Sequence, residues 1–422
     1  MIKIKKLTSG LLALGLSASL FFQTPVFAAE ETTQDAAVQD TGSAVSTNSI
    51  PGWPQGSDIT STAAVVMEAS TDTILYAKNM DQTLYPGSTV KIMTTLLALE
   101  NSQLADNVTM TQTGVSGVTD GGASISSQLD EVFSMEQCLY SIMLASANDI
   151  ALQVAEHIGG SVDTFVQMMN TRAQELGCTN TVFTNPTGLP DENQHTTAHD
   201  MALIMEAAIS NETFRTIAST ASYTIAATNV SGGSRVLTNN FSMITNGNAS
   251  YYEGCLGGKE GYTEASGSTI ACAASRGGMT LIAVVFQGAQ GTTAAEAVSI
   301  LDYGYNNFQL LDVGDTDFNL ISGGIVVAPM GISENDITTE DTAADDGNLN
   351  RTYYYGGTAI GTGRVMPSEE QDLSLLTQGQ ENMAAAQDLS ANKTPVPYYV
   401  IGGVGAFLLL LLILWIVKIV KS

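Results

Sequence analysis

Basic residues are scarce in this 422-residue sequence, which contains 15 lysines and arginines but 42 aspartates and glutamates. The resulting formal net charge of −27 disfavours nucleic acid as a partner, and it disfavours binding to anionic lipid over this surface. Apart from lysines close to the two ends of the chain, only Lys78, Lys91, Lys259 and Lys393 are present. Because lysine is used so rarely, each of these four side chains requires a specific explanation.

Cysteine is also rare, and the four cysteines show no C-x-x-C or other metal-binding spacing. Cys138 and Cys178 lie in apolar helical or post-helical surroundings, which favours buried thiols. Cys255 and Cys272 flank an expected hairpin, so a cross-strand disulfide stays open beside the alternative of two free thiols. The sequence leaves the redox state of this second pair undecided.

Histidine occurs only three times. His195 and His199 have i, i+4 spacing, but no acidic residue completes a zinc pattern such as H-E-x-x-H around them. We expect surface or packing roles for both side chains, and the sequence therefore predicts no metal site.

Long apolar runs are confined to the two ends of the chain. Residues 1–28 combine a basic start, a short apolar run and a small-residue cleavage site, which is the pattern of a cleaved signal peptide. Residues 398–417 form an uncharged apolar run long enough for one membrane-spanning helix. Basic residues in the tail 418–422 place that side in the cytoplasm. We therefore expect a single-pass protein of the cell membrane with most of its chain outside the cell.

Composition divides the chain between these ends into four parts. Residues 29–57 are acidic and rich in threonine, which predicts a disordered lead with ordered structure beginning near Ser61. Residues 58–310 carry the regular apolar patterns of a folded domain, and residues 311–366 show the short apolar runs of a small β-rich domain. Residues 367–397 are polar and indicate a stalk above the membrane.

The main domain is predicted to be an α/β unit with strands at both ends and helices in the middle. Two short apolar runs separated by Thr71-Asp72 predict a hairpin, and residues 134–206 carry helical periodicity. Strand patterns follow beyond residue 213, and a final helical pattern at 293–308 closes the unit. This order favours a mostly antiparallel sheet flanked by helices over a doubly wound parallel sheet.

The stretch "PGSTVK" places Ser88 and Lys91 three residues apart, on one face of a helix whose first turn holds Ser88. The positive end of the helix dipole stabilises an oxyanion at Ser88. A buried Lys91 loses solvation of its ammonium and can take the Ser88 proton as a base. The pattern alone is weak, because a capping serine followed by a surface lysine occurs in many helices.

Two further motifs strengthen this interpretation. "LASANDIA" presents Ser146 and Asn148 between two expected helices, where a hydroxyl and an amide can point into one cleft; a helix-capping pair is the structural alternative. "GGKEG" presents Lys259 before Gly261 on an expected strand. The order S-x-x-K, S-x-N and K-x-G matches the motifs of serine β-lactamases and penicillin-binding proteins.

The surroundings of these motifs narrow the resemblance further. "YPGSTVKIMTTLLALE", "MLASANDIALQVAEHIGG", "LGCTNTVFTNPTGLPDENQHTTAHDMALI" and "GGKEGYTEASG" closely resemble the low-molecular-mass D-alanyl-D-alanine carboxypeptidases, penicillin-binding proteins of bacterial cell-wall metabolism. The resemblance covers roughly residues 58–310. It implies the penicillin-binding protein/serine β-lactamase-like fold with a helical subdomain, followed by the small β domain and the C-terminal transmembrane helix.

The resemblance also implies a role for each matching residue. The catalytic residues would be the nucleophile Ser88, its general base Lys91 and the proton relay Ser146. The backbone N–H groups of Ser88 and Tyr262 would form the oxyanion hole. Peptidoglycan stem peptides would be the substrate, β-lactams would trap the acyl-enzyme, and no metal or organic cofactor is implied. The substrate-binding residues would be Asn148, Lys259, Gly261 and Tyr262.

Glu260 departs from the family pattern, which has threonine or serine between the lysine and the glycine of the third motif. The substitution removes a hydroxyl donor and adds an acceptor-only charge. Strand alternation or an unlocated arginine would keep Glu260 from opposing Lys259. A catalytically weakened, wall-sensing homologue is therefore the alternative to an active carboxypeptidase. A β-lactamase is less favoured, because "NPTGLPDEN" stands where those enzymes carry E-x-x-L-N.

Overall fold

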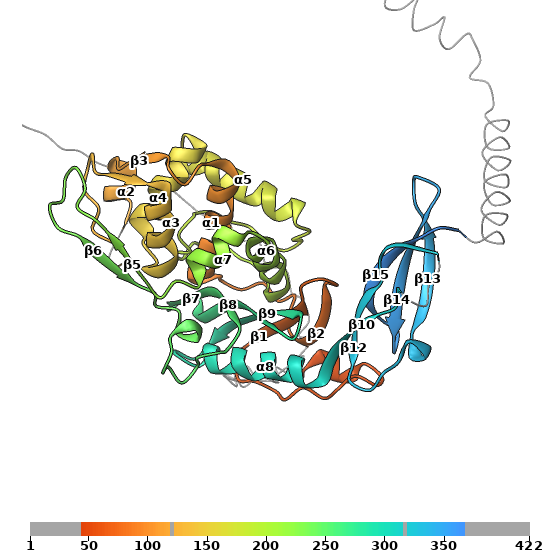
Figure 1. Ribbon diagram of the computed structural model, residues 1–422. Coiled ribbons are helices and arrows are strands. Elements are labelled where there is room, and N and C mark those ends of the chain that lie inside the picture. The colour runs from red at the N-terminus through yellow and green to blue at the C-terminus, as the bar shows by residue number, and fades with distance from the viewer. Residues whose placement is uncertain (1–43, 119–121, 315–318, 368–422) are drawn as a thin grey trace, which may run out of the picture. The chain divides into compact units, whose positions relative to one another are not determined.

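The computed structural model describes residues 44–118, 122–314 and 319–367 (Figure 1). The predicted signal peptide, the membrane-spanning helix and the cytoplasmic tail lie outside these residues, as does the predicted stalk apart from Pro367. Within the described ranges, no helix is both long enough and apolar enough to cross a membrane.

A five-stranded antiparallel sheet in the order β2-β1-β9-β8-β7 forms the scaffold, which confirms the expected strand arrangement. Strand β7 lies at one edge, so its outer backbone groups are open to a neighbouring segment or a ligand. The β1–β2 turn contains the predicted Thr71-Asp72 pair, and Asp72 has a φ of 55°. The strands are β1 (Ala63–Glu68), β2 (Thr73–Lys78), β7 (Cys255–Thr263), β8 (Gly267–Arg276) and β9 (Met279–Gly288).

Both faces of this sheet are covered, so strand β1 is buried along its whole length. Alternate side chains point to opposite faces of a strand. Ala63, Val65 and Met67 therefore join the larger core, which contains most of the helices, while Ala64 and Val66 join a second core beneath α8 (Thr293–Asn307).

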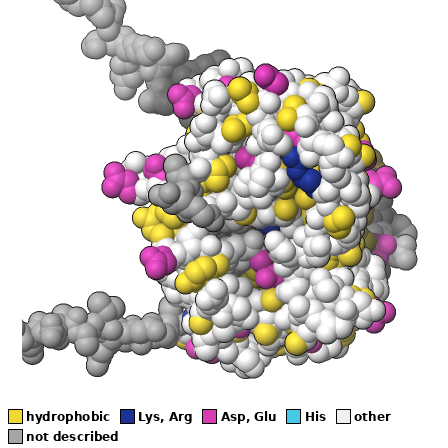
Figure 2. All heavy atoms as spheres, turned by 90° about the vertical axis from the view of Figure 1, so that its left-hand side faces the viewer, with side chains coloured by type: hydrophobic (Ala, Val, Ile, Leu, Met, Phe, Trp, Pro, Cys, Tyr) yellow, Lys and Arg dark blue, Asp and Glu magenta, His cyan; other side chains and the backbone are white. Residues whose placement is uncertain are grey.

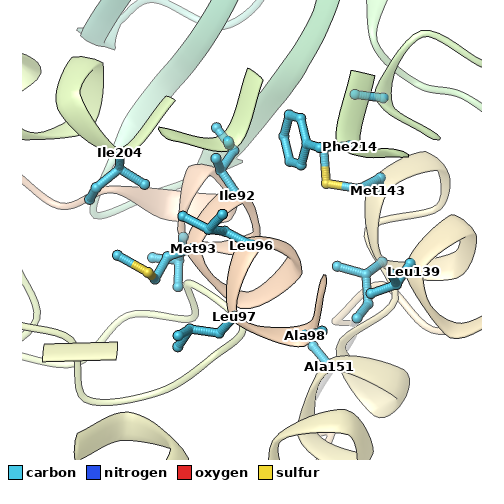
Figure 3. Packing of buried hydrophobic residues seen from close by; sticks show 14 of the residues in the cluster. Ile92, Met93, Leu96, Leu97, Ala98, Leu139, Met143, Ala151, Ile204 and Phe214 are labelled. Atoms are coloured by element: carbon cyan, nitrogen blue, oxygen red, sulfur yellow. The ribbon is translucent and has the colours of Figure 1, made fainter. Parts of the chain in front are cut away.

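Helix α1 (Val90–Asn101) lies at the centre of the larger core (Figure 3). Each fully buried leucine or isoleucine contributes about 1.5–3 kcal/mol through removal of apolar surface from water. This burial holds the amino-terminal end of α1, where Ser88 and Lys91 lie, in a fixed position. The labelled neighbours around its apolar side chains are Leu139, Met143, Ala151, Ile204 and Phe214.

The remaining helices follow the predicted pattern in the middle of the domain. Helix α5 is followed by Gly177 with a φ of 86°, which is the expected glycine stop. At the start of α6 the Thr197 hydroxyl accepts from the Asp200 N–H at 3.0 Å. The Asp200 carboxylate instead binds Asn180 N at 2.8 Å, so only half of the expected capping box forms. These helices are α2 (Gln112–Ser116), α3 (Met135–Leu144), α4 (Asn148–Gly159), α5 (Val162–Glu175), α6 (Ala198–Ser210) and α7 (Glu212–Ala218).

Shorter sheets complete the described chain. Two antiparallel pairs flank the helices, β3 (Asn107–Thr109) with β4 (Val132–Ser134) and β5 (Ser222–Ile225) with β6 (Arg235–Thr238). After α8, β10 (Phe308–Asp312) pairs with β12 (Ile325–Pro329), and a four-stranded sheet has the order β11-β15-β14-β13. Its strands are β11 (Leu320–Gly323), β13 (Thr338–Ala343), β14 (Leu349–Tyr355) and β15 (Thr358–Val365).

The prediction of a disordered lead over 29–57 is wrong for the part that the structure describes, residues 44–57. The Trp53 ring is buried and its Nε1 donates to Leu75 O at 2.9 Å. Val45 is buried in the same core. Two apolar side chains are enough to bind this otherwise polar segment to the sheet, and an average over its composition hides them.

The four cysteines are all free thiols. Cys138, Cys178 and Cys272 are buried, as expected for the first two. The disulfide that the sequence left open does not form, because Cys272 pairs with Gly258 across the β7–β8 ladder while Cys255 pairs with Ala274. Burial raises the pKa of the Cys255 thiol to about 11.

Candidate active site

Ser88 lies on a tight turn immediately before the central helix. The 3-10 helix η2 (Gly87–Thr89) carries it, and the Val90 N–H closes this turn by donating to the carbonyls of Gly87 and Ser88. The sequence predicted Ser88 inside the first α-helical turn; it lies just ahead of that turn instead. Gly87 has a φ of 56°, a left-handed conformation that ends any helix upstream and re-aims the chain into α1.

Two glycines allow other backbone segments to approach Ser88 closely. A Cβ at Gly261 on β7 would lie 2.6 Å from Ser88 N, and a Cβ at Gly188 would lie 1.9 Å from Gly87 O. Contacts this short exclude any side chain at either position. The edge strand β7 therefore reaches Ser88 with bare backbone, as the sequence predicted for Gly261.

Ser146 meets Ser88 from the connection between α3 and α4. Its Oγ donates to Ser88 Oγ at 3.2 Å. Ser146 has a φ of 58°, which is uncommon for a residue with a side chain and costs on the order of 1–3 kcal/mol. The surrounding turn imposes this conformation, since Ala145 N and Ala147 N both donate to Ser141 O. The strain thus aims one hydroxyl at another.

Lys91 is 1% exposed and lies one turn after Ser88. Its Nζ donates to the backbone carbonyl of Thr187. Burial lowers the pKa of Lys91 well below its usual value, and the charge of Lys259 lowers it further. A lysine in this environment is available as a neutral amine, which is the form that accepts a proton.

The loop 184–194 positions the carbonyl that holds Lys91. Asn185 Oδ1 accepts from Thr187 N at 3.1 Å and from Gly188 N at 2.9 Å, which folds the loop tightly. The buried Gln194 side chain accepts from Asn185 N at 3.1 Å. Thr94 Oγ1 on α1 donates to the loop carbonyl of Pro186 at 2.7 Å. The "NPTGL" stretch therefore ties the loop to the face of α1 that carries the base.

Lys259 points toward the same site from β7. It is 2% exposed, and no described residue accepts a hydrogen bond from its Nζ. Burial lowers its pKa to about 8, although the nearby Glu260 carboxylate acts in the opposite direction. A buried ammonium without a protein acceptor is an anion site prepared for a ligand.

Asn148 supplies an unused acceptor beside Ser146. Its side chain is 4% exposed, and its Oδ1 has no hydrogen-bond partner among the described residues. Its backbone N–H donates to Ala123 O at 2.8 Å, which fixes the residue at the start of α4. The cap of this helix is Ala147, with no side-chain bond, so the capping alternative for this motif does not apply.

Glu260 is bound by a serine and not by an arginine. Its Oε1 accepts from Ser242 N at 3.0 Å and from Ser242 Oγ at 2.5 Å, at the start of the 3-10 helix η3 (Ser242–Ile244). On β7, Glu260 pairs with Ile270 while Lys259 pairs with Ala271, so the two side chains leave the strand on opposite faces. Glu260 therefore does not oppose Lys259; its charge favours the ammonium form of that lysine.

Tyr262 completes the predicted group. Its side chain is 50% exposed, and it pairs with Ser268 across the β7–β8 ladder. The predicted contribution of its backbone N–H to an oxyanion hole depends on the position directly after Gly261, which the strand provides. That role stays a prediction.

The histidines lie away from any metal-binding arrangement. His195 Nδ1 is 2.9 Å from Asn193 O, and His199 Nδ1 is 3.4 Å from the Asp81 carboxylate. Across the described residues, no three His, Cys, Asp or Glu side chains are grouped to hold a metal ion.

Residues that the motif reasoning did not use support the site from behind. Thr187 acts through its carbonyl, and Asn185 and Gln194 hold that carbonyl in place. Asp149 follows Asn148 and binds the preceding loop, accepting from Ser127 Oγ at 2.8 Å. The only sequence signal was the family-like "NPTGL" stretch, which had no role in the three-motif logic.

The charge distribution agrees with an isolated cationic centre on an acidic protein. On the face in Figure 2, acidic side chains are scattered and basic side chains are few. The two lysines of the site are buried, so they affect only a ligand that enters the cleft.

Known proteins share this arrangement. A family model described as D-alanyl-D-alanine carboxypeptidase, peptidase S11, matches residues 47–290. The D-alanyl-D-alanine carboxypeptidase DacF of Bacillus subtilis is 32% identical over 255 residues, which are 58% of this chain and 62% of that protein. The D-alanyl-D-alanine carboxypeptidase of Streptomyces sp. strain K15 is 31% identical over 285 residues, which are 64% of this chain and 97% of that protein.

A solved structure gives the same result for the fold. Penicillin-binding protein 5 from Haemophilus influenzae superposes with a TM-score of 0.61 at 25% identity, covering 74% of this chain and 98% of that structure. The fold is therefore the penicillin-binding protein/β-lactamase-like α/β fold. With the family model matching more than half of its length, the chain belongs to the serine D-alanyl-D-alanine carboxypeptidase family of low-molecular-mass penicillin-binding proteins.

Proposed function

We propose that this protein removes the terminal D-Ala of peptidoglycan stem pentapeptides through an acyl-enzyme on Ser88. The observation that carries the proposal is the contact between Ser146 Oγ and Ser88 Oγ, with the buried Lys91 one turn away. Two hydroxyls and a neutral amine in this arrangement can pass a proton from the nucleophile to a leaving amine.

Acylation begins when Ser88 Oγ attacks the carbonyl of the scissile D-Ala–D-Ala bond. The Ser88 proton passes to the Lys91 amine, and the tetrahedral oxyanion is stabilised by the backbone N–H groups of Ser88 and Tyr262. Ser146 then delivers a proton to the leaving nitrogen, the C–N bond breaks, and D-alanine departs. The remaining peptide is held as an ester of Ser88.

Deacylation reverses the proton path. Water attacks the ester carbonyl and gives its proton to Lys91, the Ser88 C–O bond breaks, and Ser88 recovers its proton. Because Lys91 serves both steps, its lowered pKa is a requirement for turnover and not only for the first attack.

Substrate binding would use groups that the folded chain leaves without partners. The free ammonium of Lys259 would receive the terminal carboxylate of the substrate. Asn148 Oδ1, which has no partner among the described residues, would accept the N–H of the substrate peptide. A β-lactam presents the same carboxylate and carbonyl, so it would acylate Ser88 and leave slowly.

The place of action follows from the chain ends. The signal-peptide pattern of residues 1–28 and the apolar run of residues 398–417 support export and a single C-terminal membrane anchor, with the catalytic domain outside the cell. A cell-surface location would give the site access to peptidoglycan.

A direct test measures D-Ala release from a stem pentapeptide by wild type and Ser88→Ala, with fluorescent penicillin labelling in parallel. The expected result is release and labelling by wild type, with neither by the variant. Labelling without release would favour the weakened, wall-sensing homologue instead. Loss of both from wild type would remove the enzyme reading.

A further inference from the structure

We infer that Glu260 makes the leaving-group end of the site select substrates whose departing amine lacks a free α-carboxylate. The preferred class is a peptide that ends in a carboxamide, or one whose scissile bond leads to an amine with an amidated neighbour. This inference rests on the proposed acyl transfer at Ser88 and specifies which leaving group that reaction accepts.

The first observation is the lack of a second available cation. Lys259 carries the one positive charge placed to meet a substrate carboxylate. The arginines of the described residues are bound elsewhere, to acidic side chains or to a carbonyl. Their partners are Glu100 and Glu175 for Arg172, Ile209 O for Arg215, Glu131 for Arg235, Asp302 for Arg276, Asp341 for Arg351 and Asp346 for Arg364.

The second observation is the way Glu260 is held. Both donors from Ser242 bind Oε1 and stabilise negative charge on that oxygen. The other oxygen, Oε2, receives no hydrogen bond from any described residue, and the side chain is only partly buried. Glu260 therefore presents a fixed, unfilled acceptor at the outer edge of β7.

Together these groups reverse the usual chemistry of this position. A lysine followed by threonine offers one positive charge and a hydroxyl donor, which suits a carboxylate. Here the lysine is followed by a negative charge, so the pair is neutral and its outer group only accepts. A substrate carboxylate would be repelled by Glu260, whereas an amide N–H₂ would donate to Oε2.

The reaction with such a substrate balances without any further reactant. Ser88 Oγ forms an ester with the penultimate D-Ala carbonyl, the C–N bond breaks, and the former Ser88 proton leaves on the departing amine. The product is D-alaninamide, or a peptide amine when the bond is a cross-link. Water then hydrolyses the ester as in the carboxypeptidase reaction.

The test compares two pentapeptides that are identical except for a terminal carboxylate or carboxamide. We expect wild type to cleave the carboxamide with a kcat/KM about 10-fold or more higher than the acid. Glu260→Thr should invert this ratio, and Glu260→Gln should bring it close to one. Glu264→Gln, which removes an exposed carboxylate four residues along the same chain segment, serves as the matched control and should keep the wild-type ratio.

Penicillin acylation of each variant separates the two levels of the proposal. If wild type is not acylated by penicillin, the acyl-transfer function itself fails. If wild type is acylated but prefers the acid, and Glu260→Thr leaves the ratio unchanged, the specificity inference is overturned and the acyl-transfer function stands. Equal melting temperatures of the variants would show that the ratio reports the site and not the fold.

Discussion

The catalytic centre and the four-stranded sheet β11-β15-β14-β13 treat charged side chains in opposite ways. In the sheet, Arg351 Nε lies 2.7 Å from Asp341 Oδ1, so a half-buried cation faces its own anion across β13 and β14. In the catalytic centre, Lys91 and Lys259 are buried and neither forms an ion pair with an acidic side chain among the described residues. The sheet neutralises its charges internally, while the site leaves them for a ligand.

This difference teaches where folding free energy has been given up for function. Burying an ammonium without a counter-ion destabilises the charged form, and the fold responds with lowered lysine pKa values, to about 8 for Lys259. The strained backbone of Ser146 and the unfilled Asn148 Oδ1 belong to the same pattern. Substrate or β-lactam supplies the missing partners.

The largest effect is expected for Lys91→Ala. Without the base, acylation by penicillin should slow by about 10²–10⁴-fold, measured as the rate of fluorescent penicillin labelling. Lys78→Met is the matched control, because Lys78 is also buried but binds Ile59 O at 2.6 Å and Asp58 at 2.9 Å. A similar loss in the control would mean that the rate reports damage to the fold.

The pH profile is the next test of the unpaired charges. Since burial lowers the pKa of Lys259 to about 8, its ammonium is lost as pH rises through that value. The kcat/KM for a pentapeptide with a free carboxylate should therefore fall above about pH 8. Glu260→Thr should move this descending limb to lower pH, because Glu260 raises the Lys259 pKa. A limb unchanged by Lys259→Met would assign it to another group.

A smaller effect is expected for Asn185→Ala, which frees the loop that holds Lys91. Asn185 Oδ1 binds two loop N–H groups, and Thr187 O binds the base. Misplacement of the base should slow acylation by roughly 10–100-fold with little change in penicillin affinity before acylation. Stopped-flow kinetics separate these two quantities, and a pure loss of affinity would contradict the positioning role.

The smallest effect is expected in the four-stranded sheet. Asp341→Asn should lower the free energy of unfolding by about 1 kcal/mol or less, because a paired charge near the surface contributes little. Acylation of Ser88 should be unchanged. Thermal melting and penicillin labelling measure both quantities, and a loss of labelling would show that the two regions are coupled.

The motif spacing predicted which side chains would meet, because S-x-x-K, S-x-N and K-x-G each carry their chemistry in a few adjacent residues. The partner of Lys91 lies 96 residues away and acts through a backbone carbonyl, so no residue type at Thr187 reveals it. The partner of Glu260 was equally hidden, since Ser242 is an ordinary serine in a polar stretch. The sheet order was predictable from alternation; the packing of Trp53 was not.

The most direct test of the account is the mass of the intact protein after exposure to penicillin, followed by peptide mapping. We predict one covalent penicilloyl group on Ser88 in wild type and none in Ser88→Ala. A wild-type protein that stays unmodified, or that carries the group on another residue, would contradict the assignment of this site.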